Sequence, residues 1–156
     1  MTKIKLMVLM LIAFNASAQT DIKRLPKTPI ETVKAFLSAY QQRDHASFSF
    51  LLHPDVVWVQ PGDNRISGVK TSKAELLLMG KKMWELSEGT IRLEHVEYFE
   101  GNGNTVVAVL RWTAVHPAGA TLDVRNVDVY TVEDGKIILG RIYSEDVAAE
   151  NRFWMK

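Results

Sequence analysis

The chain of 156 residues contains no cysteine, so disulfide bonds and thiol chemistry have no part in its folding or function. An oxidising compartment would be tolerated, and a lipid anchor on a cysteine is excluded. The chain also has no large excess of positive or negative charge, because it contains 19 Lys and Arg residues and 18 Asp and Glu residues. The basic residues are scattered and form no one-sided stripe, so we expect no nucleic-acid partner.

Cofactor and metal signatures are absent as well. The sequence has no glycine-rich phosphate loop, no nucleophile elbow and no internal repeat. The spacing of His45, His53 and His95 matches no metal-ligand template. We therefore expect neither a cofactor nor a metal site.

The amino terminus has the pattern of a secretory signal peptide. Lys3 and Lys5 precede an apolar run from Leu6 to Phe14, and the small residues Ala16 and Ala18 follow it. The run is too short to span a bilayer, and its charges lie at one end, unlike those of an amphipathic helix. We expect residues 1–18 to be removed, leaving a bacterial periplasmic or secreted protein that begins at Gln19 and has no membrane contact after cleavage.

The rest of the chain has the size of one domain, with a flexible start at 19–27 and a single domain at 28–156. Thr28, Pro29 and Glu31 form a capping-box pattern that begins a helix with apolar residues at helical spacing. A second helix is expected at about 44–52. A third begins at Ser72, which forms a second capping-box pattern with Glu75.

The chain then changes to strand patterns. A strand at 56–60 turns towards a short partner near Ile66, and period-two alternation predicts strands at 91–100, 105–116, 120–132 and 136–144. The connections between these four strands are short and turn-prone, so consecutive strands should pair antiparallel. Helices first and a meander last predict an α+β fold.

The strand at 120–132 carries polar residues on its more apolar face, where Asn126 and Asp128 alternate with Leu122, Val124 and Tyr130. A hairpin that pairs Glu133 with Lys136 places Asp128 opposite Arg141 and Asn126 opposite Tyr143. This register holds for a loop of two or four residues, whereas a three-residue loop with a bulge would turn the last strand over and remove Arg141 from this face. Two interpretations stay open: Asp128 and Arg141 form a structural ion pair, or they give polarity to a pocket.

The pattern of the whole mature chain resembles the SnoaL-like branch of the nuclear transport factor 2-like superfamily. The resemblance rests on the helix from Val33 to Asp44, the segment from Leu52 to Trp58, Gly68, the strand from Asn126 to Tyr130, and the turn from Asp134 to Ile137. It implies a cone-shaped fold, with three amino-terminal helices packed on a strongly curved antiparallel sheet around a pocket. It also implies a homodimer formed through the sheet.

The enzymes of this superfamily offer a residue-by-residue test. Where the ketosteroid isomerase branch has a base, an oxyanion-binding Tyr and an Asp, this chain has Gln60, Phe36 and Asp128. Of the acid–base residues of the epoxide hydrolase branch only Arg111 is matched, since Thr113 and Ile142 replace the acids. The cyclase branch likewise expects an acid near Ile142. Whether the protein is an enzyme is therefore left open.

We expect an exported domain that binds a small, largely apolar molecule. Asp128 and Arg141 are the candidate catalytic residues, and the remaining predicted pocket residues are Phe36, Tyr40, Trp58, Gln60, Trp112, Asn126, Tyr130 and Tyr143. Two alternatives remain: an isomerase, cyclase or lyase that uses Asp128 for proton transfer, and a non-catalytic dimerisation module.

Overall fold

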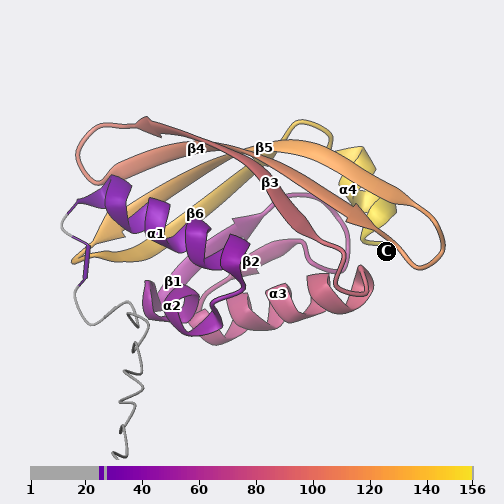
Figure 1. Cartoon of the computed structure of the whole chain (residues 1–156), viewed down its shortest axis with the longest axis horizontal. Helices are drawn as coiled ribbons and strands as arrows, with labels where there is room; N and C mark the ends of the chain where they lie inside the picture. Colours follow the sequence, from indigo (N-terminus) through magenta and orange to yellow (C-terminus); the bar gives the residue numbers. More distant parts are fainter. Residues whose placement is uncertain (1–24, 27, 156) are drawn as a thin grey trace, which may run out of the picture.

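The computed structural model describes residues 25–26 and 28–155, so the predicted signal peptide and its cleavage site lie outside the described residues. The fold is α+β, as predicted (Figure 1). Its helices are α1 (Pro29–Gln42), α2 (His45–Phe50), α3 (Lys73–Leu86) and α4 (Val147–Phe153). Its strands are β1 (Leu52–Gln60), β2 (Gly68–Lys70), β3 (Arg92–Glu100), β4 (Thr105–Val115), β5 (Thr121–Glu133) and β6 (Lys136–Ser144).

The helices begin where the sequence places their caps. At α1 the capping box is complete: Thr28 Oγ1 accepts from the backbone N–H of Glu31 at 3.3 Å, and Glu31 Oε2 accepts from that of Thr28 at 3.0 Å. At α3 Ser72 accepts from the N–H of Glu75 at 3.3 Å. The return bond differs from a capping box, because Glu75 Oε2 accepts from the N–H of Thr71 at 2.6 Å.

The six strands form one sheet in the order β2-β1-β6-β5-β4-β3. The hairpin pairings are antiparallel, as predicted, but β1 and β6 run parallel, so the sheet is mixed. The turn of a hairpin can be recognised in the sequence from its turn-forming residues. The parallel strands β1 and β6 are separated by most of the domain, so no local sequence pattern marks their pairing. The short partner of β1 is Gly68–Lys70, and the predicted position near Ile66 lies in the preceding turn.

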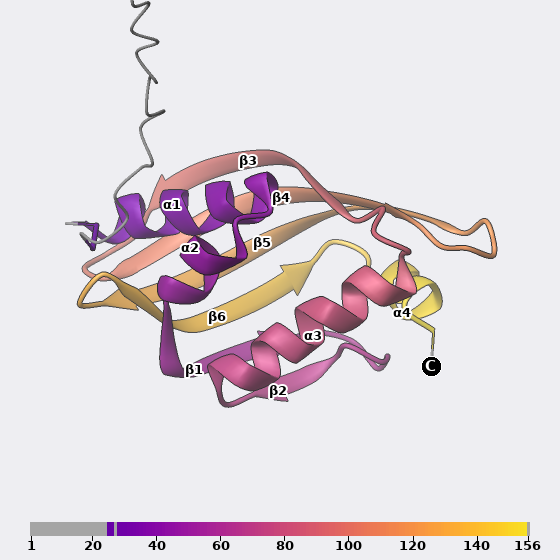
Figure 2. The same cartoon turned by 60° about the horizontal axis from the view of Figure 1, so that its bottom comes forward.

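The helices lie on the concave side of the curved sheet (Figures 1 and 2). Helix α1 packs across β3 to β6, α3 packs against β1 and β2, and α4 packs against β5. The apolar core fills the space between them, with Val33, Leu52, Val106 and Ile137 fully buried. Among the described residues, no helix is long and apolar enough to cross a membrane.

Strand β6 is turned over relative to the simple hairpin. Glu133 pairs with Lys136 as predicted, but a bulge follows, and from Thr131 opposite Leu139 onwards the register is shifted. Gly140 therefore lies opposite Tyr130 on the concave side, where the indole ring of Trp58 occupies the space that a Cβ atom would need. The bulge therefore places Gly140, which has no side chain, at the position of β6 where the Trp58 ring lies closest.

Candidate ligand pocket

A cavity of about 700 Å³ lies between the concave face of the sheet and helices α1, α2 and α3. Its wall is mostly apolar and aromatic. Phe36 stacks on Phe48 with a centroid distance of 4.4 Å, and Tyr40 meets Trp112 edge to face at 4.9 Å. Such a wall suits the burial of an apolar molecule.

Asp128 is the main polar group of the wall. Its side chain comes from the middle of β5 and is 3% exposed. Oδ2 accepts a hydrogen bond of 2.8 Å from the Tyr130 hydroxyl, whereas Oδ1 has no partner among the described residues. A buried oxygen without a partner is costly, and the residue that carries it lines a cavity that can hold one.

Burial also changes the acidity of Asp128. Loss of hydration raises its pKa from 3.8 to about 7, the bond from Tyr130 opposes the rise, and the nearby Glu150 adds to it. The pKa of Tyr130 is raised well above 10, chiefly by its own burial. Asp128 is thus protonated over much of the range below neutral pH. In that form Oδ1 can donate a hydrogen bond into the cavity while Oδ2 accepts from Tyr130.

Three further polar side chains surround this end of the cavity. Asn126, oriented so that both of its amide atoms are satisfied, donates to Glu150 Oε1 at 3.3 Å. Gln60 Oε1 accepts from Trp58 Nε1 at 3.4 Å. The pKa of Glu150 is raised by burial, against hydrogen bonds from Ser144, Asn126 and Gln60. We call the group of Gln60, Asn126, Asp128 and Glu150 the polar floor.

Eight predicted pocket residues come together around the cavity. All of them line it: Phe36, Tyr40, Trp58, Gln60, Trp112, Asn126, Asp128 and Tyr130. Ile142, where cyclases and epoxide hydrolases would carry an acid, also faces it, while Arg111 and Thr113 lie on the opposite side of the sheet.

Arg141 and Tyr143 were wrongly placed. The bulge before Leu139 turns both side chains to the convex face, where Arg141 is exposed and Tyr143 is 53% exposed. Arg141 lies opposite Val129, so it cannot pair with Asp128, which lies opposite Ile142. The predicted Asp128–Arg141 ion pair therefore does not form. Among the described residues, the acid on the concave face has no basic partner.

Sequence reasoning missed the two residues that the carboxy-terminal helix contributes, Glu150 and Trp154. Both line the cavity and are 2% and 1% exposed. A signal for this helix existed, since Asp146 caps α4 by accepting from the N–H of Ala149 at 2.8 Å. The loop before β2 holds the helix in place, because the N–H of Asp63 donates to Asn151 Oδ1 at 2.8 Å.

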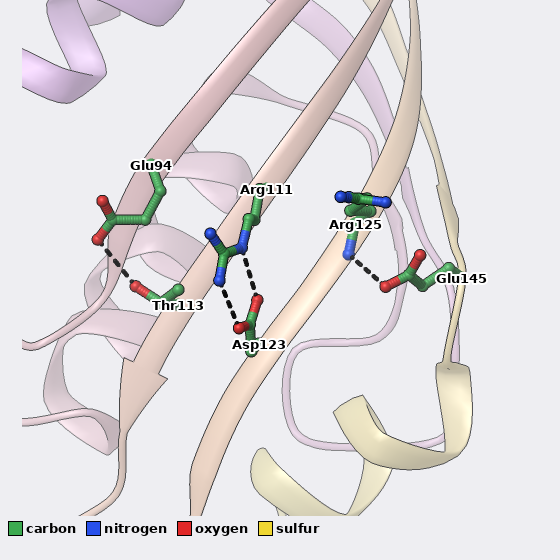
Figure 3. Close-up of polar contacts among 6 residues, drawn as sticks. All are labelled: Glu94, Arg111, Thr113, Asp123, Arg125 and Glu145. Carbon is green, nitrogen blue, oxygen red and sulfur yellow. Dashed lines mark hydrogen bonds and ion pairs between the residues drawn. The ribbon is translucent and has the colours of Figure 1, made fainter.

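The convex face of the sheet has two halves. The apolar half contains Phe99, Val107, Val109, Val127, Val129 and Tyr143, of which Phe99 is 52% and Val127 is 40% exposed. The polar half contains the ion pair of Arg111 and Asp123 at 2.6 Å and the contact between Glu94 and Thr113 (Figure 3). Helix α4 does not cover this face, since Trp154 lies at the cavity on the other side.

Known proteins resemble the chain in sequence and fold. The family model of the SnoaL-like domain matches residues 33–140. A Xanthomonas campestris protein with a cystatin-like fold is 34% identical, with a TM-score of 0.78 over 83% of this chain and 99% of the other. TerC, crystallised with polyporic acid, is 25% identical with a TM-score of 0.69 over 80% and 97%. The Mycobacterium tuberculosis protein Rv0034 is 26% identical over 80% of this chain and 95% of its own.

Proposed function

Since this chain belongs to the SnoaL-like domain family, we propose that it binds a small, largely apolar molecule in its cavity, with a polar atom of that molecule against Asp128 Oδ1. The observation that carries the proposal is the unpartnered carboxyl oxygen on the wall of a cavity of about 700 Å³. A ligand that accepts or donates at this oxygen recovers a hydrogen bond, which is worth about 1 kcal/mol net and more when it replaces an unmade bond.

The alternative of a purely structural module predicts a cavity filled by aromatic side chains. Trp58, Trp112 and Tyr130 instead surround an open volume. A large cavity and a buried acid both lower stability, so their presence together favours a binding role over a packing role. The relative crystallised with polyporic acid supports a small organic ligand.

The enzyme alternative is favoured by the burial of Asp128, which raises the pKa of its carboxyl group to about 7. General acids and bases work best when their pKa lies near the working pH. In such an enzyme Asp128 would give its proton to, or take one from, a ligand atom at Oδ1. Glu150 would supply the second carboxyl group at the polar floor.

We also propose that the protein is exported and acts in the periplasm or outside the cell. The amino-terminal sequence pattern supports this proposal. Its consequence is that the ligand is met outside the cytoplasm.

Native mass spectrometry of protein purified from its own host tests the binding proposal. We expect an adduct of a few hundred daltons, a mass suited to the cavity, that is lost on denaturation. Asp128→Leu keeps the branch at Cγ but replaces both oxygens by methyl groups, so it should retain less of the adduct. Wild-type protein that carries no adduct and binds no neutral apolar probe would refute the proposal.

A further inference from the structure

The charged residues that line the cavity are sorted by sign and by depth. The two buried ones are acidic, Asp128 and Glu150, and both belong to the polar floor. Three basic residues line the same cavity and are exposed: Arg43, Lys81 and Arg92. One half-buried acid, Asp44, lines it beside them. Exposed residues that line a cavity lie at its mouth, so the mouth has an excess of positive charge while the floor is acidic.

Two of these cations, Arg43 and Arg92, are fixed in place beside the aromatic wall. The Arg43 guanidinium lies over the Trp84 ring at 4.8 Å, and Trp84 packs so closely on Gly89 that a Cβ atom there would lie 2.6 Å from the indole. Arg92 Nη1 donates to the carbonyls of Gly89 and Ile91, both at 2.7 Å. These contacts fix the positions of the two guanidinium groups. Their partners are an aromatic ring and neutral carbonyl groups, which do not neutralise the positive charges.

The two arginines also act on the same point inside the cavity. Burial raises the pKa of the Tyr40 hydroxyl to about 12, and the charges of Arg92 and Arg43 both oppose that rise. The end of α1 is tied to the start of β3, because Gln41 Nε2 donates to the carbonyl of Leu93 at 3.1 Å. Trp84 links the two arginines, because Arg43 lies over its ring and the ring packs on Gly89, whose carbonyl accepts from Arg92. Arg43 and Arg92 therefore belong to one region of the cavity mouth.

One carboxylate lies in this region, but it does not pair with an arginine. Asp44 lines the cavity next to Arg43, and its oxygens accept from the backbone N–H and the hydroxyl of Ser47 as the cap of α2. Lys81 has an exposed partner, Glu85, at 3.6 Å. Among the described residues, no acidic side chain forms an ion pair with Arg43 or Arg92.

We infer that the ligand is an amphiphilic anion, whose carboxylate or similar group is bound at the mouth by Arg43 and Arg92 while its apolar body fills the cavity. This inference rests on the proposed function and adds the charge and the orientation of the ligand. Arginine suits such a group because its planar guanidinium can donate two parallel bonds to one carboxylate. An anion buried at the floor would meet Asp128 and Glu150 but no cation among the described residues, so the charged end faces outward and the uncharged end meets Asp128.

Two naphthylamine probes of similar shape test the inference on the full-length mature protein. One is neutral, N-phenyl-1-naphthylamine, and the other carries a sulfonate, 8-anilino-1-naphthalenesulfonate. The wild type should bind both. Arg43→Gln and Arg92→Gln should each weaken the anionic probe by roughly tenfold and leave the neutral probe within about twofold. Arg65→Gln, an exposed cation outside the cavity, is the matched control and should change neither probe.

Salt gives a second measurement that does not depend on a substitution. Raising the ionic strength from about 20 mM to about 500 mM should weaken the anionic probe in the wild type and leave the neutral probe unchanged. Anionic-probe affinity that is unchanged in both arginine variants, or equal losses of both probes, would overturn the inference and leave the proposed function standing. If the wild type bound neither probe, the proposed function would fall as well.

Discussion

Asp128→Asn is the substitution that best tests the chemistry of the cavity. It keeps the size and shape of the side chain and retains an oxygen that can accept from Tyr130, but it removes the ionisable group. No cation is left unpaired, because Arg141 lies on the other face of the sheet. The effect on stability should therefore come from ionisation and not from a broken ion pair.

The direction in which stability changes with pH follows from the direction of the pKa shift of Asp128. Asp128 titrates at about 7 in the folded chain and near 3.8 when unfolded, so the folded chain holds this proton more tightly. Its contribution to stability is fully present below the unfolded pKa and is lost as the pH rises through the folded pKa. The difference between these two pKa values corresponds to a loss of stability on the order of 4 kcal/mol between pH 4 and pH 8. The asparagine variant does not have this loss.

Urea unfolding of both proteins over this pH range measures the difference. At pH 4 the variant should be equal to the wild type or about 1 kcal/mol less stable, and by pH 8 it should be the more stable of the two. Asp123→Asn, on the convex face of the same strand, is the control. Its pKa is lowered by Arg111, so its contribution is lost as the pH falls. Parallel pH profiles for wild type and Asp128→Asn would refute the reasoning.

Three more predictions follow from the fold and the sequence. Gly140→Ala should cost roughly 1–3 kcal/mol in urea unfolding, because its Cβ atom collides with Trp58. Gly80→Ala, an exposed position in α3 where the Cβ atom meets nothing, should instead stabilise by about 0.5–1 kcal/mol. The wild type should sediment as a homodimer through its exposed apolar half-face, and Val127→Glu should give monomers; a monomeric wild type would exclude this interface. Amino-terminal sequencing of the exported protein should begin at Gln19; a product that retains the leader would contradict export.

Most of the fold could be predicted because its signals are local. The capping residues Thr28 and Ser72 mark helix starts, and alternation along β5 separates its buried face from its exposed face. The parallel pairing of β1 with β6 could not be predicted in the same way. It joins segments about eighty residues apart, and only the packing of the whole domain determines which strands meet there.

The candidate site, too, could be predicted only where the signals are local. The apolar faces of α1 and β5 predicted the aromatic wall and the position of Asp128 in the pocket, whereas the position of Arg141 depended on one bulge. Both faces of β6 carry apolar residues, so its sequence alone does not show which face is buried and does not reveal a one-residue slip. Glu150 was missed because a short terminal helix can pack on either side of a sheet.

This single bulge changes the chemistry expected of the cavity. Without it, Arg141 would face Asp128, hold it ionised and satisfy it, and the pair would be structural. With it, Gly140 and Ile142 take the concave positions, and the acid lies next to Glu150 with one oxygen free. The only cations left for the cavity are those at its mouth, among the described residues. The proton-bearing floor is thus a consequence of the β6 register, whereas the basic mouth comes from residues of α3, β3 and the end of α1. Together they support the proposed ligand, which is anionic only at its outer end.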